Sequence, residues 1–319
     1  MKRSGNGVAY GIAAYSMWGL FPLYWPLLEP SSDIEILAHR IVWALLVVTA
    51  LITLTRGWRR VRAISRRTVG LLALAGVIIT VNWGTYIYGV NNGHVVETSL
   101  GYFINPLVTV IFGVVILQER LRRWQWVAVG IGFVAVVILA IDYGRPPWIS
   151  LILAFSFGTY GLLKKRANTG AVESMGIETA TVALPMLGYL LFLHGTGSGT
   201  FGTAGALHVT LLVGTGVITV IPLLFFGAAA IRVPLTTIGL LQYLAPVFQF
   251  ALGVLVFQED VPPARWFGFG LVWLALAILT TETLSIRRRL LRAAQTGTGQ
   301  APPVADETDD AAAATRPAS

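Results

Sequence analysis

Residues 100–119 have the sequence LGYFINPLVTVIFGVVILQE, and residues 240–259, 140 positions later, have the sequence LLQYLAPVFQFALGVLVFQE. Ten of the 39 positions from 100 to 138 are identical to their counterparts at this offset. The most informative matches are Pro106/Pro246, Gly113/Gly253, Gln118/Gln258, Glu119/Glu259, Trp126/Trp266 and Gly130/Gly270, and the pairs Gly76/Gly216 and Ser16/Ser156 keep the offset. The alternative is a chance match of two apolar stretches, but the glycines, prolines and tryptophans in register favour an internal repeat.

The composition around this repeat is that of a membrane protein. Only 12% of the 319 residues are charged, 55% are hydrophobic, and the mean hydropathy is +0.71. A soluble domain carries about 25% charged residues because water must wet its surface. The net charge of +8 does not indicate nucleic acid as a partner, because the arginines lie in short loops between apolar spans. The chain has no cysteine, which excludes disulfides and thiolate metal sites.

Ten apolar segments are each close to the length that crosses a bilayer, and only helices satisfy every backbone group in lipid. The first is interpreted as a retained helix rather than a cleaved signal peptide, because it is long and lacks a small-residue cleavage site. The predicted spans are 8–27, 34–55, 69–90, 96–117, 124–141, 147–163, 172–193, 207–229, 235–257 and 265–283.

Basic residues alternate between the loops that join these spans. The N-terminus, the even-numbered loops and the segment after the tenth span hold nineteen lysines and arginines, whereas the odd-numbered loops hold only Arg145 and Arg265. Basic loops stay in the cytoplasm. The pattern therefore predicts a multi-pass protein of the cytoplasmic (plasma) membrane with both termini in the cytoplasm.

The repeat and the topology together predict the architecture. A repeat of five helices contains an odd number of crossings, so the second copy must be inverted relative to the first. We expect an all-α polytopic membrane protein of ten transmembrane helices, with a first repeat at 1–143, a second, inverted repeat at 144–285, and a disordered cytoplasmic tail at 286–319. Inverted repeats are typical of carriers that open alternately to the two sides of a membrane.

Charged residues inside a span are the first candidates for a functional site, because they are costly in lipid. Glu35 and His39 share one face of the second span, and Arg40 lies roughly 10 Å deep at 1.5 Å per residue. These residues predict a substrate or proton site in a central cavity. A structural clamp between a glutamate and Arg40 that joins two helices, or an arginine that extends outward to the interface, is the alternative.

Glu178 lies near the cytoplasmic end of the seventh span, on the repeat counterpart of the helix that carries Glu35. Burial disfavours the charged form of a carboxylate, so Glu35, His39 and Glu178 are candidates for proton coupling. Exposure at a helix start is the alternative for both glutamates.

Polar and aromatic residues within the spans complete the predicted substrate site. Amides in mid-span need partners, which favours Asn82, Asn105 and Gln242, whereas aromatic residues near span ends also suit an interfacial belt. The full set of candidates is Tyr15, Trp18, Glu35, His39, Arg40, Asn82, Tyr86, Tyr102, Asn105, Glu178, Gln242 and Tyr243.

Four stretches in the spans resemble the RarD proteins, which belong to the EamA branch of the drug/metabolite transporter superfamily. They are Glu35-Ile-Leu-Ala-His-Arg40, Glu97-Thr-Ser-Leu-Gly-Tyr-Phe-Ile-Asn-Pro106, Phe155-Ser-Phe-Gly-Thr-Tyr-Gly161 and Leu240-Leu-Gln-Tyr243. The resemblance covers all ten spans and implies two EamA repeats. Two residues depart from the family pattern: Pro26 stands where lysine is expected, and Ala44 where serine is usual.

Together these features predict a secondary active transporter of small metabolites or drugs. The chain has no G-x-x-x-x-G-K-[ST] and no HExxH, so neither ATP nor a metal nor another cofactor is expected. The expected partners are a small-molecule substrate, the lipid bilayer and a coupling proton. The alternatives are a membrane-embedded enzyme that acts on a lipid-linked substrate through His39 and Glu35, and a receptor or scaffold without flux. The sequence leaves the substrate, the direction of transport, the coupling ion and the oligomeric state open.

Overall fold

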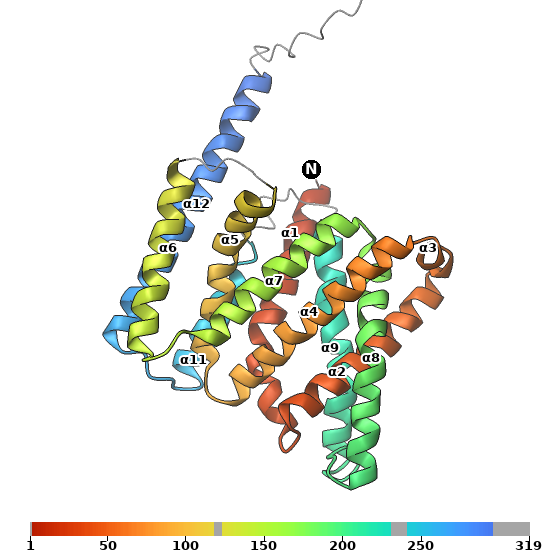
Figure 1. The fold of residues 1–319 in the computed structure, drawn as a ribbon. Helices are drawn as coiled ribbons and strands as arrows, with labels where there is room; N and C mark the ends of the chain where they lie inside the picture. The colour runs from red at the N-terminus through yellow and green to blue at the C-terminus, as the bar shows by residue number, and fades with distance from the viewer. Residues whose placement is uncertain (1, 118–122, 231–240, 296–319) are drawn as a thin grey trace, which may run out of the picture. The chain divides into compact units, whose positions relative to one another are not determined.

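The computed structural model describes residues 2–117, 123–230 and 241–295, and the secondary structure in these ranges is helical throughout (Figure 1). The chain divides into two compact units, Met1–Leu279 and Thr280–Ser319. The arrangement described below is that of the first unit.

The described α-helices follow the predicted spans closely in sequence. The second span, predicted at 34–55, is α2 at Asp33–Leu54. The helices are α1 Lys2–Leu20, α2 Asp33–Leu54, α3 Trp58–Arg62, α4 Arg66–Asn91, α5 Val95–Leu117, α6 Arg123–Asp142, α7 Trp148–Ala167, α8 Ala171–Thr196, α9 Ala206–Ala230, α11 Leu244–Leu255 and α12 Pro263–Gln295.

The first span differs from its prediction. It was expected to be helical over 8–27, but α1 ends at Leu20 and is followed by two short 3₁₀ turns, Phe21–Leu23 and Trp25–Leu28. Each turn has a proline in its first two positions, Pro22 or Pro26. A proline supplies no backbone N–H for an α-helical bond and clashes with the preceding turn, which ends the regular helix. This break carries Phe21 and Trp25 into the core, where both are buried.

The last spans also differ in extent. The ninth was predicted at 235–257; its residues 235–240 lie outside the described ranges, and α11 ends at Leu255. The tenth was predicted to end at 283, whereas α12 continues to Gln295. Residues 286–295 of the expected tail are therefore helical, and the rest of that tail, 296–319, lies outside the described residues.

Six of the described helices, α2, α4, α6, α8, α9 and α12, are long and apolar enough to cross a membrane, and α7 and α11 contain shorter apolar segments. Large apolar side chains cover their outer surfaces, among them Leu54 (80% exposed), Leu184 (77%) and Ile141 (74%). Such a surface suits lipid rather than water. The number of crossings and the inverted repeat remain predictions from the sequence.

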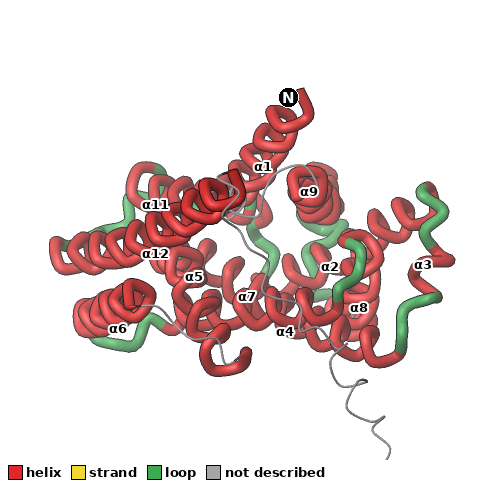
Figure 2. The backbone as a smooth tube through the Cα atoms, turned by 90° about the horizontal axis from the view of Figure 1, so that it is seen from above, coloured by secondary structure: helices red, strands yellow, loops and turns green. Residues whose placement is uncertain are grey.

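Helices from the two halves of the chain interdigitate. Helix α4 packs against α7 and α8, α5 against α7 and α11, α2 against α8 and α9, and α1 against α9 and α11 (Figure 2). Two glycines allow the closest approaches. A Cβ on Gly76 of α4 would lie 2.5 Å from the carbonyl oxygen of Glu178 on α8, and one on Gly216 of α9 would lie 2.5 Å from the carbonyl carbon of Trp43 on α2.

Candidate functional site

Arg40 occupies the centre of the candidate site. It lies on α2 between α4 and α9, and only 3% of its surface is exposed. Its Nε donates a hydrogen bond to the hydroxyl oxygen of Thr219 on α9 over 2.9 Å. The guanidinium carbon lies 4.2 Å from the ring centroid of Trp83, 5.0 Å from that of Trp25 and 5.7 Å from that of Phe21. These rings stabilise the cation through their negative faces.

The charge of Arg40 has no acidic partner among the described residues. The Nη1 atom is buried and makes no hydrogen bond. Glu35, one of the partners expected for Arg40, instead contacts Thr200, so an ion pair between Glu35 and Arg40 is absent from the structure. Cation–π contacts contribute about 2 kcal/mol when desolvated, whereas burying a charge costs several kcal/mol. The site therefore holds a positive charge that its protein surroundings compensate only in part.

Asn82, Tyr86 and Tyr102 form a polar group close to Arg40. The side-chain nitrogen of Asn82 donates to the carbonyl oxygen of Leu153 (3.0 Å) and to the hydroxyl of Ser156 (2.9 Å), while its oxygen accepts from the hydroxyl of Tyr102 (3.3 Å). These bonds fix the amide and the tyrosine relative to α7. The prediction that a mid-span amide must find partners holds for Asn82.

Tyr86 is the second group here with an unsatisfied donor. Its side chain is 3% exposed, its hydroxyl makes no hydrogen bond, and its ring centroid lies 5.8 Å from that of Tyr102. Both tyrosine side chains are close enough to Arg40 to interact with its charge. Buried polar groups are normally paired, so Arg40 Nη1, the Tyr86 hydroxyl and the indole Nε1 of Trp25, which all lack a hydrogen bond, need an explanation.

Asn105 joins two helices by a hydrogen bond, and Tyr15 and Trp18 make aromatic contacts. The amide nitrogen of Asn105 donates to the carbonyl oxygen of Ala154 (3.2 Å), which joins α5 to α7. Tyr15 and Trp18 lie edge to face at 5.2 Å, and both contact Phe226 on α9. The side chain of Gln249, which was not among the predicted residues, donates to the carbonyl oxygen of Trp18.

Glu35 and His39 lie at the N-terminal end of α2, where they hold the loop that joins α8 to α9. The Glu35 carboxylate accepts hydrogen bonds from the backbone N–H of Thr200 (2.7 Å) and from its hydroxyl (3.0 Å). The ring of His39 stacks on Phe201 at 4.9 Å. These contacts account for the burial of Glu35, whereas His39 accepts from the indole N–H of Trp43 at Nδ1 and has no partner at its buried Nε2.

Glu178 belongs to a third group, between α7 and α8. Its carboxylate accepts from Lys164 Nζ (2.7 Å) and from the hydroxyl of Tyr160 (3.0 Å), and the side chain is 4% exposed. Gln242 and Tyr243 form the turn directly before α11. The predicted set thus separates: Arg40, Asn82, Tyr86 and Tyr102 cluster, and the other candidates lie in different groups.

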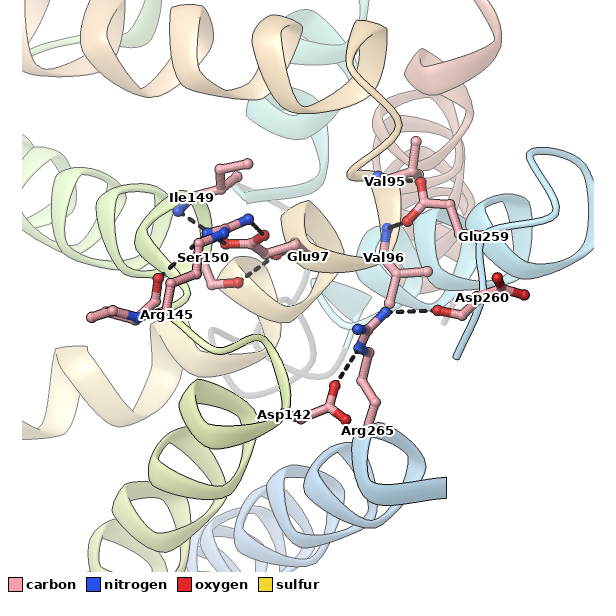
Figure 3. Close-up of polar contacts among 11 residues, drawn as sticks. Val95, Val96, Glu97, Asp142, Arg145, Ile149, Ser150, Glu259, Asp260 and Arg265 are labelled. Atoms are coloured by element: carbon pink, nitrogen blue, oxygen red, sulfur yellow. Dashed lines mark hydrogen bonds and ion pairs between the residues drawn. The ribbon is translucent and has the colours of Figure 1, made fainter. Parts of the chain in front are cut away.

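The sequence interpretation missed a cluster of charged residues at the N-terminal end of α5, which is drawn in Figure 3. Glu97, 1% exposed, accepts from Arg145 Nη2 (2.8 Å), and Arg265 Nε donates to Asp142 (2.9 Å). Glu259 accepts from the backbone N–H groups of Val95 and Val96, which caps α5. A cavity of about 380 Å³ is lined by Gly93, His94, Glu97, Tyr143, Arg145, Glu259, Asp260 and Arg265.

Two groups in this cluster have pKa values above their ordinary ones. Burial raises the pKa of Glu259, although its backbone hydrogen bonds and Arg265 oppose the shift. Burial likewise raises the pKa of Tyr143, whose ring lies 4.2 Å from the guanidinium carbon of Arg265. The sequence did contain a signal that predicts this cluster. Arg145 and Arg265 are the two basic residues of the odd-numbered loops, and acidic residues shortly precede each of them.

Comparison with known proteins assigns the chain to a family. The model of the EamA-like transporter family matches residues 5–141. A Streptomyces exfoliatus protein named "Protein RarD" is 61% identical over 286 residues, which cover 89% of this chain and 91% of that protein. The chain belongs to the RarD-type proteins of the EamA branch, in the drug/metabolite transporter superfamily.

Other relatives agree in length and in description. "Uncharacterized transporter YojE" of Bacillus subtilis is 41% identical, over 89% of this chain and 96% of the relative, and "Protein RarD" of Escherichia coli is 36% identical, over 90% and 98%. One solved crystal structure superimposes with a TM-score of 0.57 at 20% identity, over 90% of this chain and 99% of the other, and shares the fold. The protein is thus a multi-pass membrane protein of a transporter family.

Proposed function

We propose that the protein is a secondary transporter that moves a small metabolite or drug across the cytoplasmic membrane by alternating access, and that Arg40 is part of its substrate site. The observation that carries this proposal is the buried, incompletely compensated guanidinium beside the orphan hydroxyl of Tyr86. Charged residues within membrane-spanning helices are rare and mark substrate or ion pathways in many transporters.

The helix contacts support an inverted repeat. Helices α1, α2, α4 and α5 of the first predicted repeat have α7, α8, α9 and α11 as counterparts at an offset near 140 residues. The packing of α1 on α9 and α11 then matches that of α7 on α4 and α5, and the packing of α2 on α9 matches that of α8 on α4. Gly76 and Gly216, one of the repeat pairs, each lie against the backbone of the second helix of the opposite repeat.

With these repeats, Arg40 would lie at an interface between them. Its hydrogen bond crosses from α2 in the first repeat to α9 in the second. In transporters built from inverted repeats, the substrate site lies at such an interface, and alternating access moves one repeat against the other. A ligand bound there contacts both repeats and can bias their relative position.

Reconstitution in liposomes tests the proposal. Radiolabelled metabolites are offered one at a time to vesicles preloaded with the unlabelled compound, and the internal label is analysed for chemical identity. We expect saturable exchange of unchanged substrate by the wild type, and loss of exchange in Arg40→Gln. The matched control is Arg166→Gln, which removes an exposed arginine on α7. Exchange by Arg40→Gln at the wild-type rate would contradict the assignment of the site, and a chemically altered product would favour the enzyme alternative.

A further inference from the structure

The charge balance of the described residues points to the chemistry of the ligand. Seven described carboxylates already have partners other than Arg40, and no described carboxylate forms an ion pair with Arg40. The seven are Asp33 with Asn91, Glu35 with Thr200, Glu97 with Arg145, Asp142 with Arg265, Glu173 with Arg60, Glu178 with Lys164 and Glu259 with the backbone of Val95 and Val96. The counter-charge that Arg40 needs must therefore come from outside the described chain. We propose that the Arg40 site binds substrates that carry a carboxylate on a flat, apolar body.

Two free donors define where the carboxylate binds. Arg40 Nη1 and the hydroxyl of Tyr86 are both buried and both lack an acceptor in the described structure, and the indole Nε1 of Trp25 is a third buried donor without one. A carboxylate is acceptor-only and planar, and its two oxygens suit a guanidinium N–H and a neighbouring hydroxyl. Hydrogen bonds between charged partners are about twice as strong as neutral ones. An anion thus satisfies both orphans and neutralises the buried charge in one step.

The rest of the cluster is suited to an apolar group. Trp83, Trp25 and Phe21 surround the guanidinium, and the ring of Tyr102 lies between Tyr86 and Phe157, with its centroid 6.0 Å from that of Phe157. Aromatic walls favour flat ligands, which stack on them at centroid distances of about 4.5–7 Å. A neutral or cationic ligand of the same shape gains the stacking, but leaves Arg40 uncompensated or adds a second positive charge.

This inference rests on the proposed substrate site, and a set of three nearly isosteric probes tests its charge. 4-Fluorobenzoate, 4-fluorobenzamide and 4-fluorobenzamidine differ mainly in being anionic, neutral and cationic near neutral pH. Their binding to the full-length protein in detergent is measured by ¹⁹F NMR line broadening, without any gradient or flux. We expect the benzoate to bind about tenfold or more tightly than the amide, because a hydrogen bond to a charged group contributes at least that factor.

Three variants connect the preference to the site. Arg40→Gln should remove the preference for the anion, Tyr86→Phe should reduce it while keeping the ring, and the control Arg166→Gln should leave it unchanged. Because Arg40→Gln can also lower the amount of folded protein, Tyr86→Phe supplies an independent result. Equal binding of the three probes, tighter binding of the benzamidine, or no binding of the benzoate to the wild type would overturn the inference.

The liposome experiment separates the two proposals. Arg40-dependent exchange of a neutral or cationic metabolite would leave the transport function standing and reject the carboxylate class. The opposite outcome is anion binding that depends on Arg40 and Tyr86, without exchange of carboxylate metabolites. It would support the ligand class and reject transport as the function of the site.

Discussion

Arg40 Nε and the hydroxyl oxygen of Thr219, 179 residues apart in sequence, lie 2.9 Å from each other. The Thr219 hydroxyl donates its own proton to the carbonyl oxygen of Thr215 over 2.8 Å, so a lone pair remains to accept from Arg40. This bond orients the guanidinium between α2 and α9. The orientation of Arg40 therefore depends on a residue that carries no charge of its own.

We expect Thr219→Val, which keeps the shape and removes the hydroxyl, to weaken substrate binding and to lower stability by about 1–3 kcal/mol. The physical reason is that Arg40 Nε loses its acceptor and stays buried. The measurements are the KM of exchange in liposomes and the melting temperature in detergent. Thr210→Val on the same helix is the control, because Thr210 is exposed and bonds only to the Ala206 carbonyl within its own helix. Equal effects of the two substitutions would show that the Arg40 bond contributes nothing specific.

The glycine contacts predict a pair of matched destabilising substitutions. Gly76→Ala and Gly216→Ala each place a methyl group 2.5 Å from backbone atoms of a facing helix, which has to move away. We expect a loss of about 1–3 kcal/mol for each, since overpacking of a tight contact costs about that much. Gly70→Ala on α4 meets nothing within 4 Å and should be neutral or stabilising, because alanine has the higher helix propensity. A rise in melting temperature for Gly76→Ala would contradict the close approach of α4 and α8.

The helices could be predicted from the sequence, and their exact partners could not. Long apolar runs predict where helices such as α2 begin and end in the sequence. In lipid, a continuous helix is the way for such a segment to hydrogen-bond all its backbone N–H and C=O groups. The break after Leu20 was missed although Pro22 and Pro26 are visible, because prolines are tolerated in many membrane helices, as Pro106 is within α5. Whether a proline kinks or ends a helix depends on its tertiary neighbours.

The candidate site was predictable only in part. Arg40 was predicted as a site residue because it lies deep within an apolar span. Its acceptor Thr219 is a small polar residue in an apolar helix, and nothing in the sequence singles it out. Spacing along α2 suggested Glu35 as a partner, whereas the carboxylate satisfies the N–H and the hydroxyl of Thr200 in a distant loop. Proximity along one helix does not determine which of several acceptors a buried group reaches in three dimensions.

Topology is testable because the chain has no cysteine of its own. Single cysteines are introduced at two exposed positions, Arg62→Cys between α2 and α4, and Ala204→Cys between α8 and α9. The distribution of basic residues predicts a cytoplasmic position for the first and an outer position for the second. In intact cells an impermeant maleimide should label only the cysteine at 204, and permeabilisation should expose the one at 62. Labelling of both in intact cells would contradict the predicted topology.

Glu259 gives the protein a pH-dependent stability of predictable sign. Its folded pKa is raised above the ordinary value of 4.5 because burial disfavours the carboxylate. The folded state therefore binds this proton more tightly than the unfolded state, and the stabilisation is complete below about pH 4.5 and lost as the pH rises through the folded pKa. Melting temperatures of wild type and Glu259→Gln in detergent should differ by an amount that changes across this window. A constant difference from pH 4 to pH 8 would contradict the shift.

The last prediction concerns proton coupling, which we propose for Glu35, His39 and Glu178. A proton-driven carrier needs a group whose proton occupancy differs between its outward-open and inward-open states. Glu178 is a candidate because it is buried between α7 and α8, where α4 also approaches, so movement of one repeat against the other changes its surroundings. Glu35 is a candidate because it binds the α8–α9 loop at the N-terminal end of α2.

The substitution of glutamine for glutamate keeps the shape of the side chain and fixes it in a neutral state. We expect the double variant Glu35→Gln, Glu178→Gln to lose its response to an imposed pH gradient in liposomes while it still exchanges substrate. Loss of the Lys164 ion pair is a structural effect that must be separated from coupling. A Lys164→Met, Glu178→Gln variant removes both charges of that pair, and a Glu35→Gln single variant leaves the pair intact. If wild-type transport is itself indifferent to the gradient, the protein is a facilitator or uses another ion, and the assignment of all three residues fails.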